Sequence, residues 1–151
     1  MKENRTLFVG WKLQACTYAS KVAPEFFVGA EPDQSILRMN GHILPLAGSA
    51  IAFVETAVHR RAVILGKPMP HLFRSVREAH PDLDPSRTLM IGDRLNTDIA
   101  FGNMNAVKYT LLVESGENKF EDAVQASQTP GRESHVPTHC APSLGFLNQY
   151  L

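Results

Sequence analysis

The sequence lacks an excess of charge of either sign, because 15 basic residues balance 15 acidic ones over 151 residues. This balance argues against a nucleic-acid partner, and no run of Lys or Arg indicates an anionic membrane surface. Only two cysteines occur, Cys16 and Cys140; they exclude a disulfide framework and favour a reducing setting in which both thiols are packed. No apolar run approaches the roughly 18 residues of a membrane span, and no signal peptide is recognisable. We therefore expect a soluble, cytoplasmic protein without a membrane partner.

The composition that is present is ordinary for a globular protein, with 44% apolar and 20% charged residues. From residue 62 onward, predicted strands and helices alternate, which indicates an α/β fold with a mostly parallel sheet. The first part of the chain does not show this regular alternation of predicted strands and helices. We therefore predict two units, residues 1–61 and residues 62–151.

Local patterns predict the elements of each unit. In the first unit they predict a helix over 12–22, a strand over 25–30, a loop over 31–45 and a helix with Ser49 as N-cap and Arg60 and Arg61 in its last turn. In the second unit they predict strands over 62–65, 88–91 and 107–113, helices over 70–79, from Asn96 or Thr97, and over 120–126, a last strand opened by Val136 and a terminal helix after Pro142. The strand over 88–91 is continuously apolar, which is typical of burial on both faces.

The most informative string is Thr88-Leu-Met-Ile-Gly-Asp-Arg-Leu-Asn-Thr-Asp-Ile99. It brings Asp93 to the carboxyl end of a strand, which is where ligands bind in open α/β sheets. Asp98 follows at the start of the next helix. Two carboxylates placed in this way can supply oxygen ligands to Mg²⁺. The simpler alternative is that both aspartates cap the helix, but the string as a whole favours the metal site.

A second string, Gly66-Lys67-Pro68, directly follows the predicted strand over 62–65. A lysine at a strand end can hold a phosphate or a neighbouring carboxylate. It is not a phosphate-binding loop of the Walker type, because Pro68 stands where Ser or Thr is required and Arg61 where the first Gly is required. Alone, the string indicates only a turn; upstream of the strand that ends in Gly92-Asp93, it becomes informative.

Two weaker features favour structural interpretations. His135, His139 and Cys140 have a spacing that zinc can use, but a full site needs four ligands and we expect none. Arg94 can reach a phosphate or form an ion pair within its loop.

Residues 66–68 and 85–99 together resemble the haloacid-dehalogenase-type phosphatases. The branch they resemble contains the 4-nitrophenylphosphatases, phosphoglycolate phosphatases and pyridoxal phosphate phosphatases, which carry a large cap. Residues 7–60 resemble, more weakly, the later part of that cap. The resemblance implies a partial Rossmann-like core with parallel strands, preceded by a partial α/β cap, and it covers only the C-terminal half of the family's architecture.

The resemblance also implies a reaction, the Mg²⁺-dependent hydrolysis of small phosphate monoesters, such as 4-nitrophenyl phosphate or phosphoglycolate, through an aspartyl phosphate. It assigns Lys67 to catalysis and, with Gly66, to substrate binding, and it assigns Asp93 and Asp98 to the metal. It implies a small phosphorylated metabolite as the partner, and a homodimer paired through the cap.

The sequence departs from the family at the nucleophile, which should be an Asp-x-Asp motif ahead of the cap. Nothing before Lys67 matches it, and Asp82-Leu83-Asp84 lies in a turn on the wrong side of Lys67. We therefore predict a truncated member without the central nucleophile strand, inactive alone. The alternatives are a non-catalytic pseudophosphatase, an interaction module that uses the cap surface, and a fragmentary product without an independent role.

Three further expectations concern geometry. Leu46 stands where the family's cap loop has glycine, which puts the family's loop geometry in doubt. Lys67, Asp93 and Asp98 should meet at the carboxyl edge of one parallel sheet. The strand over 88–91 should leave an apolar edge exposed, so the chain should self-associate.

Overall fold

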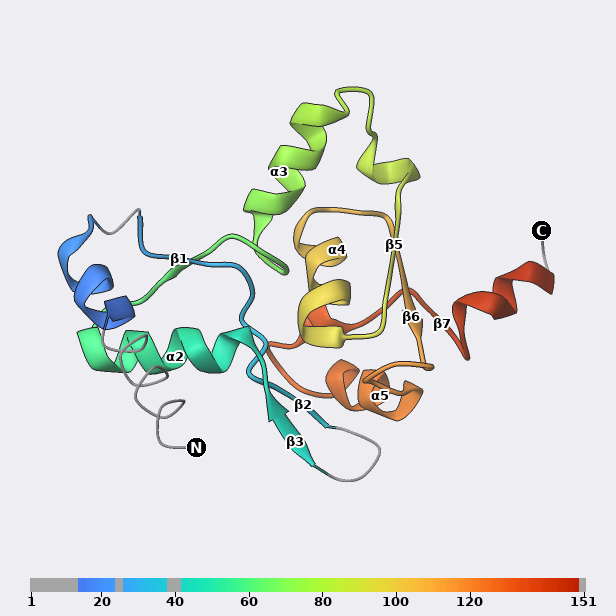
Figure 1. Cartoon of the computed structure of the whole chain (residues 1–151). Helices are drawn as coiled ribbons and strands as arrows, with labels where there is room; N and C mark the ends of the chain where they lie inside the picture. The colour runs from blue at the N-terminus through green and yellow to red at the C-terminus, as the bar shows by residue number, and fades with distance from the viewer. Residues whose placement is uncertain (1–13, 24–25, 38–41, 150–151) are drawn as a thin grey trace. The chain divides into compact units, whose positions relative to one another are not determined.

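The computed structural model describes residues 14–23, 26–37 and 42–149, and it divides the chain into two compact units, Met1–Leu65 and Gly66–Leu151 (Figure 1). The observed division follows Leu65, whereas the sequence places it after residue 61. Among the described residues, no helix is both long and apolar enough to cross a membrane. The predicted contributions of residues 7–13 lie outside the described residues.

The described residues of the first unit form two small sheets and two helices. Its elements are a helix over 14–21, β1 (Val28–Gly29), β2 (Ser35–Leu37), β3 (Ile43–Pro45), α2 (Ala47–Val58) and β4 (Val63–Ile64). β1 pairs with β4 in parallel, and β2 pairs with β3 antiparallel. The region from residue 31 to residue 45, predicted as loop, therefore contributes two short strands, which are too short to show a clear alternation of apolar and polar residues.

The parallel pair β1–β4 explains where the first unit ends. The amide of Val63 donates to the carbonyl of Phe27 (2.8 Å), and the amide of Leu65 donates to that of Gly29 (2.9 Å). The strand predicted over 62–65 therefore belongs to the first unit. The sequence pattern places it instead at the start of the second unit. Its pairing partner lies far away along the chain, so no local pattern indicates it.

Helix α2 begins earlier and ends earlier than its sequence suggests. Leu46 is the N-cap, and Ser49 lies inside the first turn, where its hydroxyl donates to the carbonyl of Gln34 (2.5 Å). Gly48 is required here, because a Cβ at this position would lie 2.3 Å from the carbonyl oxygen of Pro32. The helix ends at Val58, so the predicted basic last turn is absent.

Arg60, just beyond α2, binds a different helix instead. Its Nη1 donates to the carbonyls of Ala19 and Val22, both at 2.9 Å. These carbonyls lie at the end of the helix over 14–21, where backbone acceptors have no partner within the helix. The arginine thus caps that helix from a distant part of the chain.

The second unit is built on a three-stranded parallel sheet of order β5-β6-β7. Its elements are α3 (Pro70–Ala79), the 3-10 turn η2 (Pro85–Arg87), β5 (Leu89–Gly92), the π-helical turn η3 (Leu95–Ile99), α4 (Ala100–Met104), β6 (Tyr109–Val113), α5 (Phe120–Ser127), the 3-10 turn η4 (Glu133–His135), β7 (His139–Ala141) and the 3-10 turn η5 (Leu144–Gln149). The predicted α/β class and parallel strands are confirmed. The last strand begins at His139 and not at Val136, which ends η4 as its C-cap.

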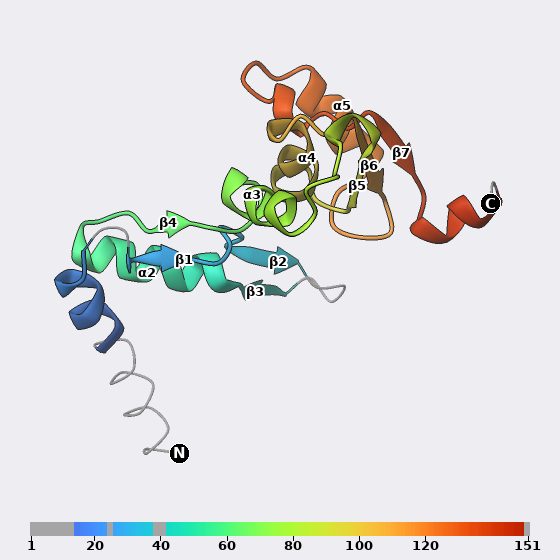
Figure 2. The same cartoon turned by 90° about the horizontal axis from the view of Figure 1, so that it is seen from above.

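Helices cover one face of this sheet. Leu112 packs with Leu95 and Ile99 of η3 and with the alanines of α5, and Phe73 of α3 meets Phe101 of α4 edge to face with ring centres 5.9 Å apart. Figure 2 shows α4 beside β5 and β6. A Cβ at Gly102 would lie 2.4 Å from Thr110, so glycine permits this close approach.

The other face of the sheet is only partly covered. Leu89 and Ile91 of β5 remain 46% and 36% exposed, and Tyr109 of β6 remains 39% exposed. The prediction that β5 is buried on both faces is therefore wrong for the described residues. An apolar run indicates that a strand can be buried, but it does not supply the element that covers it.

Candidate functional site

Asp98 is the centre of the contacts at the carboxyl end of β5. It lies in η3, and its buried carboxylate oxygen Oδ2 accepts the backbone amides of Asp93 and Arg94, both at 3.1 Å. A Cβ at Gly92 would lie 2.2 Å from Cβ of Asp98, so the chain turns back on this carboxylate only with glycine at the end of β5. The string over residues 88–99, hereafter called the signature string, therefore forms a loop closed around one of its own carboxylates.

Lys67 reaches the same carboxylate from the segment before α3. Its Nζ lies 2.5 Å from Oδ1 of Asp98, and the side chains are 43% and 7% exposed, respectively. The structure thus brings together Lys67, Asp93 and Asp98. It does not place them on one sheet, however, because the strand before Lys67 is β4, which pairs with β1 and not with β5.

Asp93 is held by a loop that the sequence did not single out. Its carboxylate oxygen Oδ2 accepts the amide of Glu117 (3.0 Å), and its carbonyl accepts the amide of Asn118 (3.0 Å). A Cβ at Gly116 would lie 2.1 Å from Oδ2 of Asp93, so this loop can approach only with glycine there. The only feature of the sequence that could have indicated this contact is Gly116, a glycine within the polar segment after β6.

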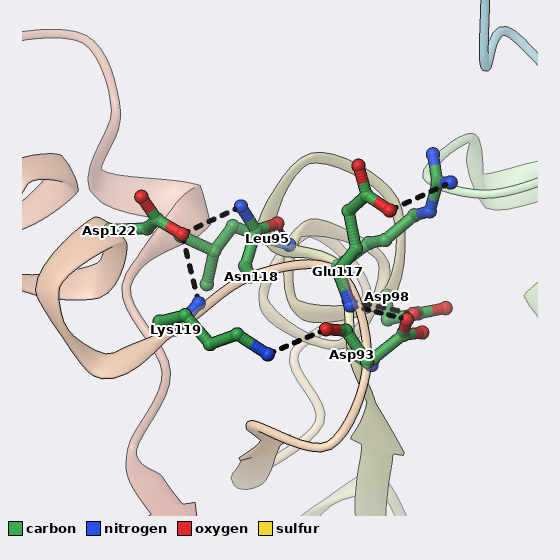
Figure 3. A network of polar contacts seen from close by, with 9 residues as sticks. Asp93, Leu95, Asp98, Glu117, Asn118, Lys119 and Asp122 are labelled. Atoms are coloured by element: carbon green, nitrogen blue, oxygen red, sulfur yellow. Dashed lines mark hydrogen bonds and ion pairs between the residues drawn. The ribbon is translucent and has the colours of Figure 1, made fainter. Parts of the chain in front are cut away.

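Asn118 and Asp122 extend these contacts into α5, as Figure 3 shows. The amide oxygen of Asn118 accepts the backbone amide of Leu95 (3.0 Å), and its amide nitrogen donates to Oδ2 of Asp122 (3.1 Å). Arg94 and Glu117 form a longer ion pair at 3.7 Å, which agrees with the interpretation of Arg94 as an ion-paired loop residue. A continuous polar network therefore joins the start of α5 to the loop that carries Asp93.

The two aspartates differ in what they can offer a metal ion. Both oxygens of Asp98 already accept hydrogen bonds, from Lys67 and from the loop amides. Asp93 presents Oδ1, which accepts no hydrogen bond from a described residue. Mg²⁺ typically uses one or two carboxylates together with water and phosphate, so these residues fit a site with Asp93 as the direct ligand. The prediction that Asp98 also serves the metal stays a prediction; the structure shows its carboxylate in contact with Lys67 and with the loop amides.

Other candidate residues are occupied elsewhere. Within the described ranges, no group of three or more His, Cys, Asp and Glu residues is placed to hold a metal ion, and this search includes His135, His139 and Cys140. Hydrogen bonds from the side chain of Ser86 and then from its backbone amide (2.8 Å) lower the pKa of the Asp84 carboxyl, and the amide contact caps η2. Burial and the nearby Glu114 raise the pKa of the Cys140 thiol, which agrees with a packed thiol.

Removing the carboxylate of Asp98 should destabilise the second unit. We expect Asp98→Ala to lower the free energy of unfolding by about 2–3 kcal/mol, since two loop amides and Lys67 lose their acceptor. Asp98→Asn keeps one acceptor oxygen for the loop amides but sets its NH2 group against the Lys67 ammonium, so it should cost about 1–2 kcal/mol. Urea denaturation measures both values. Asp82→Ala, in an exposed turn, is the control, and an equal loss in all three variants would contradict the expectation.

Comparison with known proteins shows which sequences this chain resembles. The family model described as HAD-hydrolase-like matches residues 64–146, more than half of the chain. Glycerol-3-phosphate phosphatase of Gallus gallus is 36% identical over 136 residues, which cover 89% of this chain and 43% of the relative. Chronophin of Mus musculus is 41% identical over 112 residues, which cover 74% of this chain and 37% of the relative.

Solved structures show the same similarity. Glycerol phosphate phosphatase of Mycobacterium tuberculosis in complex with magnesium matches with a TM-score of 0.69 and 29% identity, over 89% of this chain and 37% of that one. It was also solved in complex with calcium. The 4-nitrophenylphosphatase of Thermotoga maritima matches with a TM-score of 0.70 and 29% identity, over 91% of this chain and 49% of that one.

The chain thus spans less than half the length of each of these relatives. The match over residues 64–146 includes Lys67, Asp93 and Asp98, together with the loop that holds Asp93. The protein belongs to the HAD-hydrolase-like family.

Proposed function

We propose that the second unit forms the metal- and phosphate-binding side of a phosphatase site for small phosphate monoesters, such as 4-nitrophenyl phosphate or phosphoglycolate. The observation that carries this proposal is the contact of Lys67 with Asp98, whose other oxygen holds the loop of Asp93. The names of the relatives, which are phosphatases of glycerol phosphate and nitrophenyl phosphate, support the substrate class.

Each residue has a distinct role in this proposal. Lys67 keeps two N–H donors after its contact with Asp98, and its partly exposed ammonium can meet the charge of a phosphate. Gly66 accepts the amide of Met69 through its carbonyl and so shapes the turn that presents Lys67. Asp93 would ligate Mg²⁺ through Oδ1. When bound, Mg²⁺ would stabilise negative charge on the phosphoryl oxygens.

The same proposal limits what the chain does by itself. The family resemblance implies a carboxylate nucleophile in an Asp-x-Asp motif, and no residue before Lys67 matches that pattern. Asp84 of the one such motif in the chain serves as a turn cap. We therefore propose that these 151 residues bind the metal and phosphate but do not turn over a phosphate ester alone.

Location and assembly belong to the proposal as well. The family resemblance supports a homodimer paired through the first unit, and the low cysteine content supports a cytoplasmic site of action. Nothing in the described part of the chain favours the alternative of an interaction module.

Binding experiments test the proposed site directly. We expect calorimetric titration to show Mg²⁺ binding that Asp93→Asn weakens at least tenfold, and binding of inorganic phosphate in the presence of Mg²⁺ that Lys67→Gln weakens similarly. Asp82→Asn provides a matched control, because it removes a carboxylate from an exposed turn. Equal Mg²⁺ affinity in the Asp93 and Asp82 variants would refute the metal site.

A further inference from the structure

The side chain of Asn118 joins the start of η3, two residues after Asp93, to helix α5. Its amide oxygen accepts from Leu95, and its amide nitrogen donates to Asp122 (Figure 3). One end of the amide thus has a backbone donor and the other a carboxylate acceptor. This arrangement permits a single orientation of the amide.

Asp122 anchors this arrangement to the start of α5. Its Oδ2 also accepts the backbone amide of Lys119 (2.8 Å). Two hydrogen bonds lower the pKa of the Asp122 carboxyl. The one from the Lys119 backbone has the larger effect, and the one from the Asn118 side chain has the smaller. The acceptor of Asn118 is therefore an ionised carboxylate at neutral pH, and hydrogen bonds to charged groups are stronger than neutral ones.

The orientation of Asn118 also determines where its neighbour lies. Glu117 directly precedes it, and the Glu117 amide is the donor that holds Oδ2 of Asp93. The backbone amide of Asn118 itself donates to the carbonyl of Asp93. Fixing the Asn118 side chain between Leu95 and Asp122 therefore fixes both amides that hold Asp93.

We infer that Asn118 is a positioning residue, which keeps Oδ1 of Asp93 directed at its ligand by holding the loop of Gly116, Glu117 and Asn118 against residues 93–95. This inference rests on the proposed role of Asp93 as a metal ligand. It adds a residue outside the signature string, on a loop that follows the next strand. Partners that orient metal ligands commonly change affinity by about 10–100-fold when they are lost.

Two measurements on the full chain test the inference, amide hydrogen exchange in the metal-free protein and the dissociation constant for Mg²⁺. We expect Asn118→Ala to speed exchange of the Leu95 and Glu117 amides about tenfold and to weaken Mg²⁺ binding about tenfold. Asn105→Ala is the matched control, because it removes one side-chain hydrogen bond to the carbonyl of Phe101 in the same unit. It should change neither quantity.

An exchange of donor and acceptor separates positioning from general damage to the fold. Asn118→Asp alone places two carboxylates together and should weaken binding. Combined with Asp122→Asn, it restores a donor and an acceptor between the two positions and leaves an acceptor for Leu95, but the NH2 group turned toward residue 118 no longer accepts the Lys119 amide. We expect this double variant to bind Mg²⁺ more tightly, and to exchange more slowly, than Asn118→Asp alone.

The outcomes distinguish this inference from the proposed function. Mg²⁺ binding that Asp93→Asn abolishes but Asn118→Ala leaves unchanged would overturn the inference alone. Unchanged exchange at Leu95 and Glu117 in Asn118→Ala, or failure of the double variant to recover affinity, would also overturn it. A complete absence of Mg²⁺ binding by the unaltered chain would overturn both.

Discussion

The 151-residue chain is expected to leave 4-nitrophenyl phosphate unhydrolysed above background, even when Mg²⁺ is present. Lys67 and Asp93 can bind phosphate and metal, but no carboxylate among the described residues is placed as a nucleophile toward the phosphorus atom. Enzymes that use covalent catalysis lose several orders of magnitude in rate when the attacking group is removed. Asp98 does not substitute for it, because both of its oxygens are held by Lys67 and the loop amides.

The assay compares the purified chain with its Asp93→Asn variant at saturating Mg²⁺. Both should give the rate of the buffer control. Robust turnover in the unaltered chain that disappears in the Asp93 variant would show that another residue attacks the phosphate. Binding of Mg²⁺ and phosphate in the same preparation shows whether a lack of turnover reflects a missing nucleophile or a missing site.

Self-association of the chain is the second large expected effect. β5 pairs with β6 along one edge, and no other described strand pairs with its free edge. Leu89 and Ile91 are exposed beside that edge. Exposed edge strands with apolar side chains readily pair with other chains. We expect sedimentation velocity to show a mass above that of the monomer, which increases with concentration.

A charge on β5 should reverse this association. Leu89→Lys places a cation beside the free edge, and we expect it to shift the distribution strongly toward monomer. Leu72→Lys is the matched control, because Leu72 is similarly exposed, at 41% compared with 46%, but lies on helix α3. A monomeric unaltered chain at all concentrations would contradict the expectation, as would equal relief by both substitutions.

Short-range patterns predicted the elements of the second unit well. Pro70 begins α3 as expected, and the signature string places Asp93 directly after a strand. Both features are encoded within a few neighbouring residues. A proline suits the first turn of a helix, and an apolar run before Gly-Asp suits a strand that ends at a ligand site.

Features that depend on distant parts of the chain were not predictable. The pairing of β4 with β1 joins Val63 to Val28, and the hydrogen bond from Leu95 to Asn118 joins a helical turn to a later loop. Both are contacts between residues far apart in the sequence, and the local periodicity of apolar residues does not indicate such contacts. The exposed face of β5 was missed for a related reason, because a strand's composition does not show whether a covering element is present.

The contact between Lys67 and Asp98 has a consequence for the entropy of ligand binding. A free lysine side chain samples many rotamers, and ordering it costs about 2 kcal/mol. Here Asp98 has already restricted the ammonium group of Lys67, at a point where the side chain is still 43% exposed. An arriving phosphate therefore meets a cation whose freedom was largely lost when the chain folded, and less of the binding energy is spent on ordering it.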